Sequence, residues 1–182
     1  MAAIVGIHPV KTLKTDRPAV AVIVDAPSGE VAAVAKRLGR DGVEASIATT
    51  VTIDDAQLKA VRAHGDVPIP TIAHGGLFGW IRAPVLLRHE ARELHLHHHF
   101  YYLEPHNPTL GQLLLARTAG AIPVHGSVAL SAGTGLSRPL VAGDVVVVSL
   151  GSLRQGLRTL DRLAAALHAG GLIGLPLSAL AT

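Results

Sequence analysis

Eleven histidines and no cysteine make imidazole and carboxylate the metal-binding groups of this 182-residue chain. Without cysteine, thiolate zinc sites, iron–sulfur clusters and a cysteine nucleophile are excluded. His97 and His99 are two residues apart on a predicted strand, so both rings lie on one face and could hold zinc together with a third ligand. The alternative is that these rings are hydrogen-bonded within the protein core.

A single carboxylate, Asp25, directly follows the first buried apolar run, residues 19–24. At that position it could act as a general base or bind a metal ion. A carboxylate just before a helix can also cap the first free N–H groups, so both interpretations are open. Ser28, Ser149 and Ser152 are predicted caps rather than nucleophiles, because none lies in a Gly-x-Ser-x-Gly elbow.

All five aromatic residues fall within one window, residues 78–102. Aromatic rings with polar edges are typical of surfaces on which sugar rings stack. The alternatives are that they fill the core beneath a long loop or form an interface between copies of the chain. The aromatic residues are Phe78, Trp80, Phe100, Tyr101 and Tyr102.

Short apolar runs alternate with amphipathic stretches along the chain, which predicts a repeating order of strand and helix. Strands are predicted at residues 19–24, 44–49, 67–73, 96–102, 122–124, 128–130, 145–148 and 172–175. Helices are predicted at residues 30–39, 54–65 with a capping box at 54–57, 84–94, 109–119 and 153–169. Strands separated by helices form a parallel sheet, open or curled into a barrel, in one domain spanning residues 1–182 with its core at about 19–180.

In either parallel architecture the functional site lies at the carboxyl ends of the strands. The polar residues that follow the predicted strands are Asp25, Thr49, Thr50, His74, Glu104, His106, His125, Ser149 and Ser152. The turn after the first strand has neither a dinucleotide-binding glycine pattern nor a phosphate-binding loop. Rossmann and P-loop nucleotide sites are therefore excluded.

Charge and hydropathy exclude further classes of protein. The formal net charge is +3 and the basic residues are scattered along the chain, so no nucleic-acid partner is expected. No apolar run reaches the roughly 20 residues of a membrane span. The first ten residues lack the pattern of a signal peptide.

Several segments resemble the polysaccharide deacetylase domain, the NodB-type carbohydrate esterases of family 4. Residues 20–28, Val-Ala-Val-Ile-Val-Asp-Ala-Pro-Ser, are similar to its first strand, which ends in Thr-Phe-Asp-Asp-Gly-Pro. Residues 42–48 are similar to its Gly-Val-x-Ala-Thr-Phe-Phe strand, residues 143–149 to its Gly-Asp-Ile-Val-Leu-Leu-His strand, and residues 171–180 to its closing segment. The resemblance implies an α/β fold, a distorted (β/α) barrel with about seven parallel strands, and a groove for N-acetylated glycans.

The resemblance also implies a catalytic set that this chain has mostly lost. In the family, the first Asp of the opening motif is the general base and the second binds a divalent metal ion with two histidines. Asp25 matches the first of these, and Ala26 replaces the second. Thr71 takes the place of the first metal-binding histidine, and His74 lies one position out of register with the second.

Two later motifs of the family are replaced as well. Residues 102–106 stand where the family has Arg-Pro-Pro-Tyr-Gly, and Ser149 or Leu150 stands at its late catalytic histidine. In such enzymes the metal polarises the acetamide carbonyl and activates water, and one remaining carboxylate cannot supply that stabilisation. We therefore predict a catalytically inactive domain without a cofactor, which binds cell-envelope glycan or a protein partner.

An active enzyme is the alternative. In it the chain is an N-deacetylase of N-acetylated polysaccharide with Asp25 as general base. The zinc or other divalent ion would be held by a rearranged set drawn from His74, His97, His99, His106 and His125. The substrate-binding residues predicted in either case are Trp80, Phe100, Tyr101, Tyr102 and Glu104. The resemblance suggests a cell-envelope or extracytoplasmic location.

Overall fold

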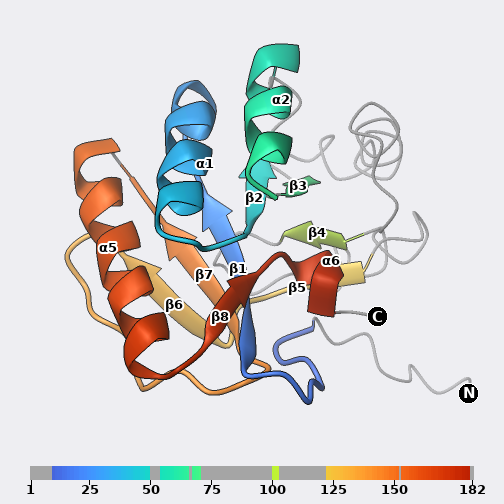
Figure 1. Ribbon diagram of the computed structural model, residues 1–182, viewed down its shortest axis with the longest axis vertical. Coiled ribbons are helices and arrows are strands. Elements are labelled where there is room, and N and C mark those ends of the chain that lie inside the picture. The colour runs from blue at the N-terminus through green and yellow to red at the C-terminus, as the bar shows by residue number, and fades with distance from the viewer. Residues whose placement is uncertain are drawn as a thin grey trace, which may run out of the picture.

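The computed structural model describes residues 10–49, 54–65, 67–70, 100–102, 122–151 and 153–180, in which strands and helices alternate (Figure 1). The strands are β1 (Ala19–Asp25), β2 (Ser46–Thr49), β3 (Val67–Pro70), β4 (Phe100–Tyr102), β5 (Ile122–Val124), β6 (Val128–Ser131), β7 (Val145–Ser149) and β8 (Ile173–Leu175). The helices are the short η1 (Ser28–Glu30), α1 (Val31–Arg40), α2 (Asp55–Ala63), α5 (Leu153–Ala169) and α6 (Leu177–Leu180).

The β1 strand is the centre of the sheet. The hydrogen-bonded order is β3-β2-β1-β7-β6, and β8 pairs with the first half of β1 while β2 pairs with its second half. A separate pair is formed by β4 and β5, and β3 contacts β4. Every pairing between these strands is parallel, which confirms the predicted α/β class.

The observed strand pairings form two separate sheets rather than a closed barrel in the described part of the chain. The β5 strand pairs with β4, and β6, which begins four residues after β5 ends, pairs with β7. No hydrogen-bonded ladder joins β3 to β4 in the described part of the chain. The parallel sheet is therefore established, and a closed ring of about seven strands stays a prediction.

Two apolar layers lie on opposite faces of the sheet. Val20, Val22 and Val24 belong to an outer cluster that includes buried residues of α1 and α5, and Figure 1 shows α5, α1 and α2 side by side along that face. Ala21 and Ile23 belong to an inner cluster, which also contains residues of β7 and α6. Because both faces of β1 are covered, its sequence is a continuous apolar run rather than an alternating one.

Within the described residues, the predicted elements agree closely with the observed ones; residues 71–73 and 96–99 of two predicted strands lie outside them. The capping box is present: the Asp54 carboxylate accepts from the Gln57 N–H at 2.7 Å, and the Gln57 amide oxygen accepts from the Asp54 N–H at 3.2 Å. The short helix α6 was not predicted; its first N–H, from Leu177, donates to the buried Ser46 hydroxyl at 3.0 Å. The helices predicted at 84–94 and 109–119 lie outside the described residues. Within the described part of the chain, no helix has the length and apolarity needed to cross a membrane.

Candidate functional site

Asp25 lies at the carboxyl end of β1, on the inner face of the sheet. Side chains alternate along a strand, and Ala21 and Ile23 belong to the inner cluster, so Asp25 shares their face. In the parallel ladders Asp25 is the register partner of Ser149 on β7, and Ser149 is the partner of Ser131 on β6. We call these three residues the carboxyl-edge row. Adjacent strands are about 4.8 Å apart, so the row spans roughly 10 Å.

The carboxyl-edge row marks the point where the buried sheet opens to solvent. Ala21 and Ile23 have no exposed surface, whereas Asp25, Ser149 and Ser131 are each partly exposed. The Ser131 hydroxyl lies 2.8 Å from the Thr134 hydroxyl. The row thus offers one carboxylate and two hydroxyl groups, which can accept and donate hydrogen bonds to a polar ligand.

Phe100, on β4, is the predicted aromatic residue whose side chain the structure describes. It is partly buried and packs against the inner cluster, on the same face of the sheet as Asp25. This packing is what the core-filling alternative requires, and stacking of Phe100 on a sugar stays a prediction. Tyr101 and Tyr102 continue the same strand and pair with Pro123 and Val124.

His125 lies between β5 and β6, where its backbone N–H donates to the Val10 carbonyl at 2.9 Å. Burial lowers the pKa of the His125 imidazole below its ordinary value of 6.5, and the charge of Lys11 lowers it further. The ring is therefore neutral at pH 7. A neutral imidazole is the form that binds metals, but within the described ranges no three His, Cys, Asp or Glu side chains are grouped closely enough to hold an ion.

The residues that follow Asp25 and Ser149, Ala26 and Leu150, supply no ligand to a divalent metal ion. Ala26 is 9% exposed and Leu150 has no exposed surface, and both side chains belong to the outer apolar cluster. Neither carries a donor atom for a metal. A carboxylate at position 26, as in the family pattern, would have to leave that cluster. The remaining predicted ligands and contacts lie outside the described residues: His74, His97, His99, His106, Trp80 and Glu104.

Ser131 is a residue of the row that the sequence did not indicate, because the predicted strand ended at residue 130. The signal was nevertheless present. Ser131 ends β6 in the same way that Ser149 ends β7, and both follow a buried aliphatic residue. A strand that loses its apolar character at its carboxyl end in a parallel sheet is a place to look for ligand contacts.

Comparison with known proteins gives matches at the level of structure. The chain matches no protein-family model, and no curated protein matches it. A family 4 carbohydrate esterase from Bacillus anthracis superposes with a TM-score of 0.72 at 12% identity, covering 94% of this chain and 86% of that one. A family 4 pseudoenzyme from Bacillus anthracis gives 0.72 at 9% identity, covering 98% and 70%. The chitin deacetylase of the fungus Colletotrichum lindemuthianum gives 0.66 at 12% identity, covering 96% and 91%.

The strand order and the structural matches together define the fold. The chain is an α/β protein built on a parallel sheet. Within that class, it has the fold of the family 4 carbohydrate esterases, a group that includes both deacetylases and a pseudoenzyme. The resemblance seen in the sequence is confirmed at the level of fold.

The environment of His125 makes a prediction about its titration. We expect the imidazole to titrate below pH 6.5 in the folded protein, because burial and Lys11 disfavour the charged ring. Lys11→Gln should move the pKa back toward 6.5, and Lys14→Gln, on the same segment, should not. An NMR titration gives the His125 pKa in the wild type and in each of the two variants. An unchanged His125 pKa in Lys11→Gln would contradict the electrostatic contribution of Lys11.

Proposed function

We propose that this domain binds an N-acetylated cell-envelope glycan at the carboxyl-edge row and does not hydrolyse it. The observation that carries the proposal is the position of Ala26. In the family resemblance this residue replaces the carboxylate that binds the metal, and here its methyl group is packed into the outer apolar cluster. Asp25 is retained beside it, where it can accept hydrogen bonds from sugar hydroxyl or amide groups.

Chemistry supports binding without hydrolysis. Cleavage of an acetamide needs a group that stabilises the negative charge developing on the carbonyl oxygen, and in a metal-dependent enzyme that group contributes several kcal/mol. Asp25 could remove a proton from water, but it cannot stabilise an oxyanion. The two serines of the row, Ser149 and Ser131, add polar contacts suited to sugar hydroxyls rather than a metal site.

The comparisons support the combination of this fold with an inactive site. One protein with the same fold is described as a family 4 pseudoenzyme, and a mutant of it is described as having restored enzymatic activity. Loss of activity therefore need not alter this fold. By the same proposal the ligand is an extracytoplasmic glycan, with an envelope protein as the alternative partner.

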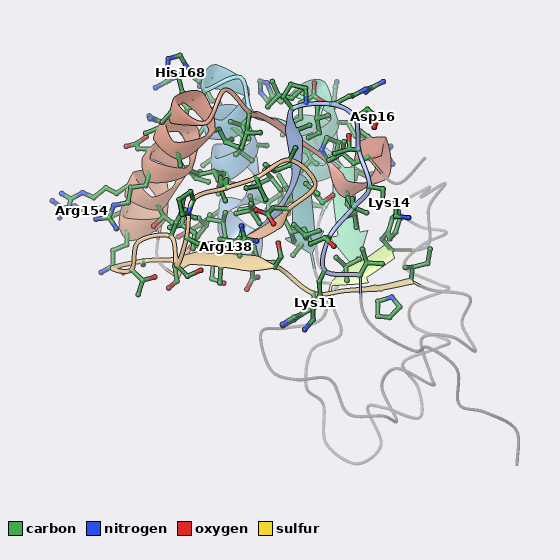
Figure 2. The ribbon with its side chains drawn as sticks, turned by 90° about the horizontal axis from the view of Figure 1, so that it is seen from below. Lys11, Lys14, Asp16, Arg138, Arg154 and His168 are labelled. Carbon is green, nitrogen blue, oxygen red and sulfur yellow. The ribbon has the colours of Figure 1, made fainter. Side chains whose placement is uncertain are left out.

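The test measures binding and acetate release side by side. Calorimetry with an N-acetylglucosamine oligomer should detect binding, and an acetate assay with added zinc or cobalt should detect no release. Asp25→Asn should weaken binding by about tenfold or more, because hydrogen bonds to a charged group contribute about 1.5–3 kcal/mol. Asp16→Asn is the matched control, since Asp16 is an exposed carboxylate that precedes the amino end of β1, whereas Asp25 ends that strand (Figure 2 labels Asp16).

Two outcomes would overturn the proposal. Stoichiometric metal in the purified protein, with acetate release that Asp25→Asn abolishes, would establish the active deacetylase with a rearranged histidine site. Absence of oligomer binding by the wild-type protein, or equal weakening by Asp16→Asn and Asp25→Asn, would remove the carboxyl-edge row as a glycan site.

A further inference from the structure

Three arginines form a row along the outer side of α5. Arg154, Arg158 and Arg162 are all exposed, and their spacing of four residues places them along one side of the helix. The buried Leu160, Leu163 and Leu167 lie on the opposite side. Figure 2 shows Arg154 extending away from the body of the molecule. At 1.5 Å per residue the row spans about 12 Å. We call it the arginine row.

Within the described residues, the arginine row carries more positive charge than the acidic residues beside it offset. Asp161, three residues after Arg158, is one carboxylate against three guanidinium groups. Asp161 is the one acidic residue of α5, and its carboxylate forms an ion pair with Arg37 of α1. Arg162 donates to the Thr134 carbonyl at 3.5 Å, which is a contact with a neutral group. In the described ranges, no carboxylate forms an ion pair with any arginine of the row.

The electrostatics of α5 disfavour the arginine row. Arg154 lies in the first turn of α5, where the helix dipole favours negative charge, and that turn contains no acidic residue. A misplaced charge of this kind costs about 0.3–1 kcal/mol. Like charges four residues apart repel by about 0.2–0.5 kcal/mol per pair. Positions that oppose local stability are where a functional explanation is expected.

We propose that the arginine row binds a linear phosphodiester polymer of the polyol-phosphate type. Guanidinium groups pair with phosphate oxygens through two parallel hydrogen bonds, and the positive end of α5 adds to the attraction. A neutral glycan would leave the net positive charge of the row without an opposite charge to bind. This inference goes beyond the proposed function and does not depend on glycan binding at the carboxyl-edge row.

The surroundings of α5 favour such a polymer over two other polyanions. A membrane surface would be expected to meet exposed apolar residues beside the cations; the exposed large apolar residues among those described are Ile122, Val141 and Ile173, none of which lies on α5. Single-stranded nucleic acid is held by aromatic stacking platforms, and α5 contains no aromatic residue. A polyol phosphate has no bases and requires no such platform.

The experiment uses the full chain and poly(glycerol phosphate) as the probe. Binding is measured at several salt concentrations for the wild type and for the triple variant Arg154→Gln, Arg158→Gln, Arg162→Gln. The variant should bind about tenfold or more weakly. The negative slope of log K against log salt should also become shallower by about two to three, as expected for the loss of three phosphate contacts. The matched control is Lys14→Gln, Arg17→Gln, Lys59→Gln, which removes the same charge from exposed sites before β1 and on α2; it should retain most of the salt dependence.

The two triple variants and the additional probes distinguish the possible outcomes. Equal loss in both triple variants would show that net charge alone causes binding, and would overturn the proposal. Tighter binding to phosphatidylglycerol vesicles or to single-stranded DNA than to poly(glycerol phosphate) would also overturn it. Binding of a neutral N-acetylglucosamine oligomer should be the same in both triple variants, so this result distinguishes failure of the arginine row from failure of the glycan site. Circular dichroism checks that each variant is folded.

Discussion

Replacing Gly143 with alanine should lower the free energy of unfolding by about 4 kcal/mol. Gly143 has a φ of +86°, which costs a residue with a side chain about 1–2 kcal/mol. A Cβ atom at this position would also overlap the carbonyl oxygen of Leu13. The backbone cannot move away easily, because the Gly143 N–H donates to the Ala19 carbonyl at 2.8 Å and the Gly143 carbonyl accepts from the Leu13 N–H at 2.7 Å. Overpacking of this kind adds about 1–3 kcal/mol.

Gly133→Ala is the matched control for this prediction. Gly133 has a φ of +89°, nearly the same as that of Gly143, but a Cβ there would meet no atom within 4 Å. Chemical denaturation should therefore show a loss of about 1 kcal/mol for Gly133→Ala. The difference between the two variants measures the contact with Leu13. Equal losses would mean that backbone conformation alone determines the role of Gly143.

The Gly-Asp pair at positions 143–144 illustrates what a sequence motif can and cannot reveal. The spacing of this pair before a run of valines contributed to the family resemblance. The motif gave no physical reason for either residue. The structure supplies one for Gly143, the close passage of the segment around Leu13, which is 130 residues away in the chain. Such a contact leaves no periodic signal near either residue.

Local signals predicted most of the described elements. The apolar run of β1, the Asp54 capping box and the amphipathic pattern of α5 depend on neighbouring residues, so they can be interpreted without the fold. What could not be predicted is set by distant partners. β8 shares an edge of β1 with β2, and α6 begins where Leu177 reaches Ser46, 131 residues earlier.

The candidate site shows the same division. Asp25 could be selected from sequence because it ends a buried strand, where parallel sheets place their functional residues. Its alignment with Ser149 and Ser131 depends on strand register, which only the ladders β1–β7 and β6–β7 reveal. Burial of Ala26 in the outer cluster likewise required the structure, although its identity had already indicated a missing ligand.

Asp144→Asn is the second substitution with a large expected effect. Asp144 is 1% exposed, and its carboxylate accepts from both terminal nitrogens of Arg138 at 2.8 and 2.6 Å, from the Ser127 hydroxyl at 2.9 Å and from the Val141 N–H at 2.9 Å. An asparagine amide would direct its own N–H groups toward one of these donors. We expect a loss of about 3 kcal/mol, because a buried network loses both its charge and part of its hydrogen bonding.

The pH dependence gives this prediction a second measurement. Burial by itself raises the pKa of Asp144, but the hydrogen bonds from Arg138, Val141 and Ser127 outweigh it, so the pKa is lowered from 3.8. A lowered pKa in the folded state means that the carboxylate stabilises the protein above pH 3.8, and that this contribution is lost as the pH falls below that value. The stability difference between wild type and Asp144→Asn should therefore be constant near neutral pH and shrink below about pH 4.

Denaturation curves at several pH values would separate this buried network from an ordinary surface ion pair. Asp41→Asn is the comparison, since Asp41, directly after α1, forms an ion pair with Arg37 of α1 at 2.9 Å and both side chains are partly exposed. It should lose far less stability, because solvent screens exposed pairs. If the two variants lost the same amount, the Asp144 network would contribute no more than a surface pair. A larger loss in Asp144→Asn that disappears in acid would identify ionised Asp144 as the group that holds the segment around Arg138 against the start of β7.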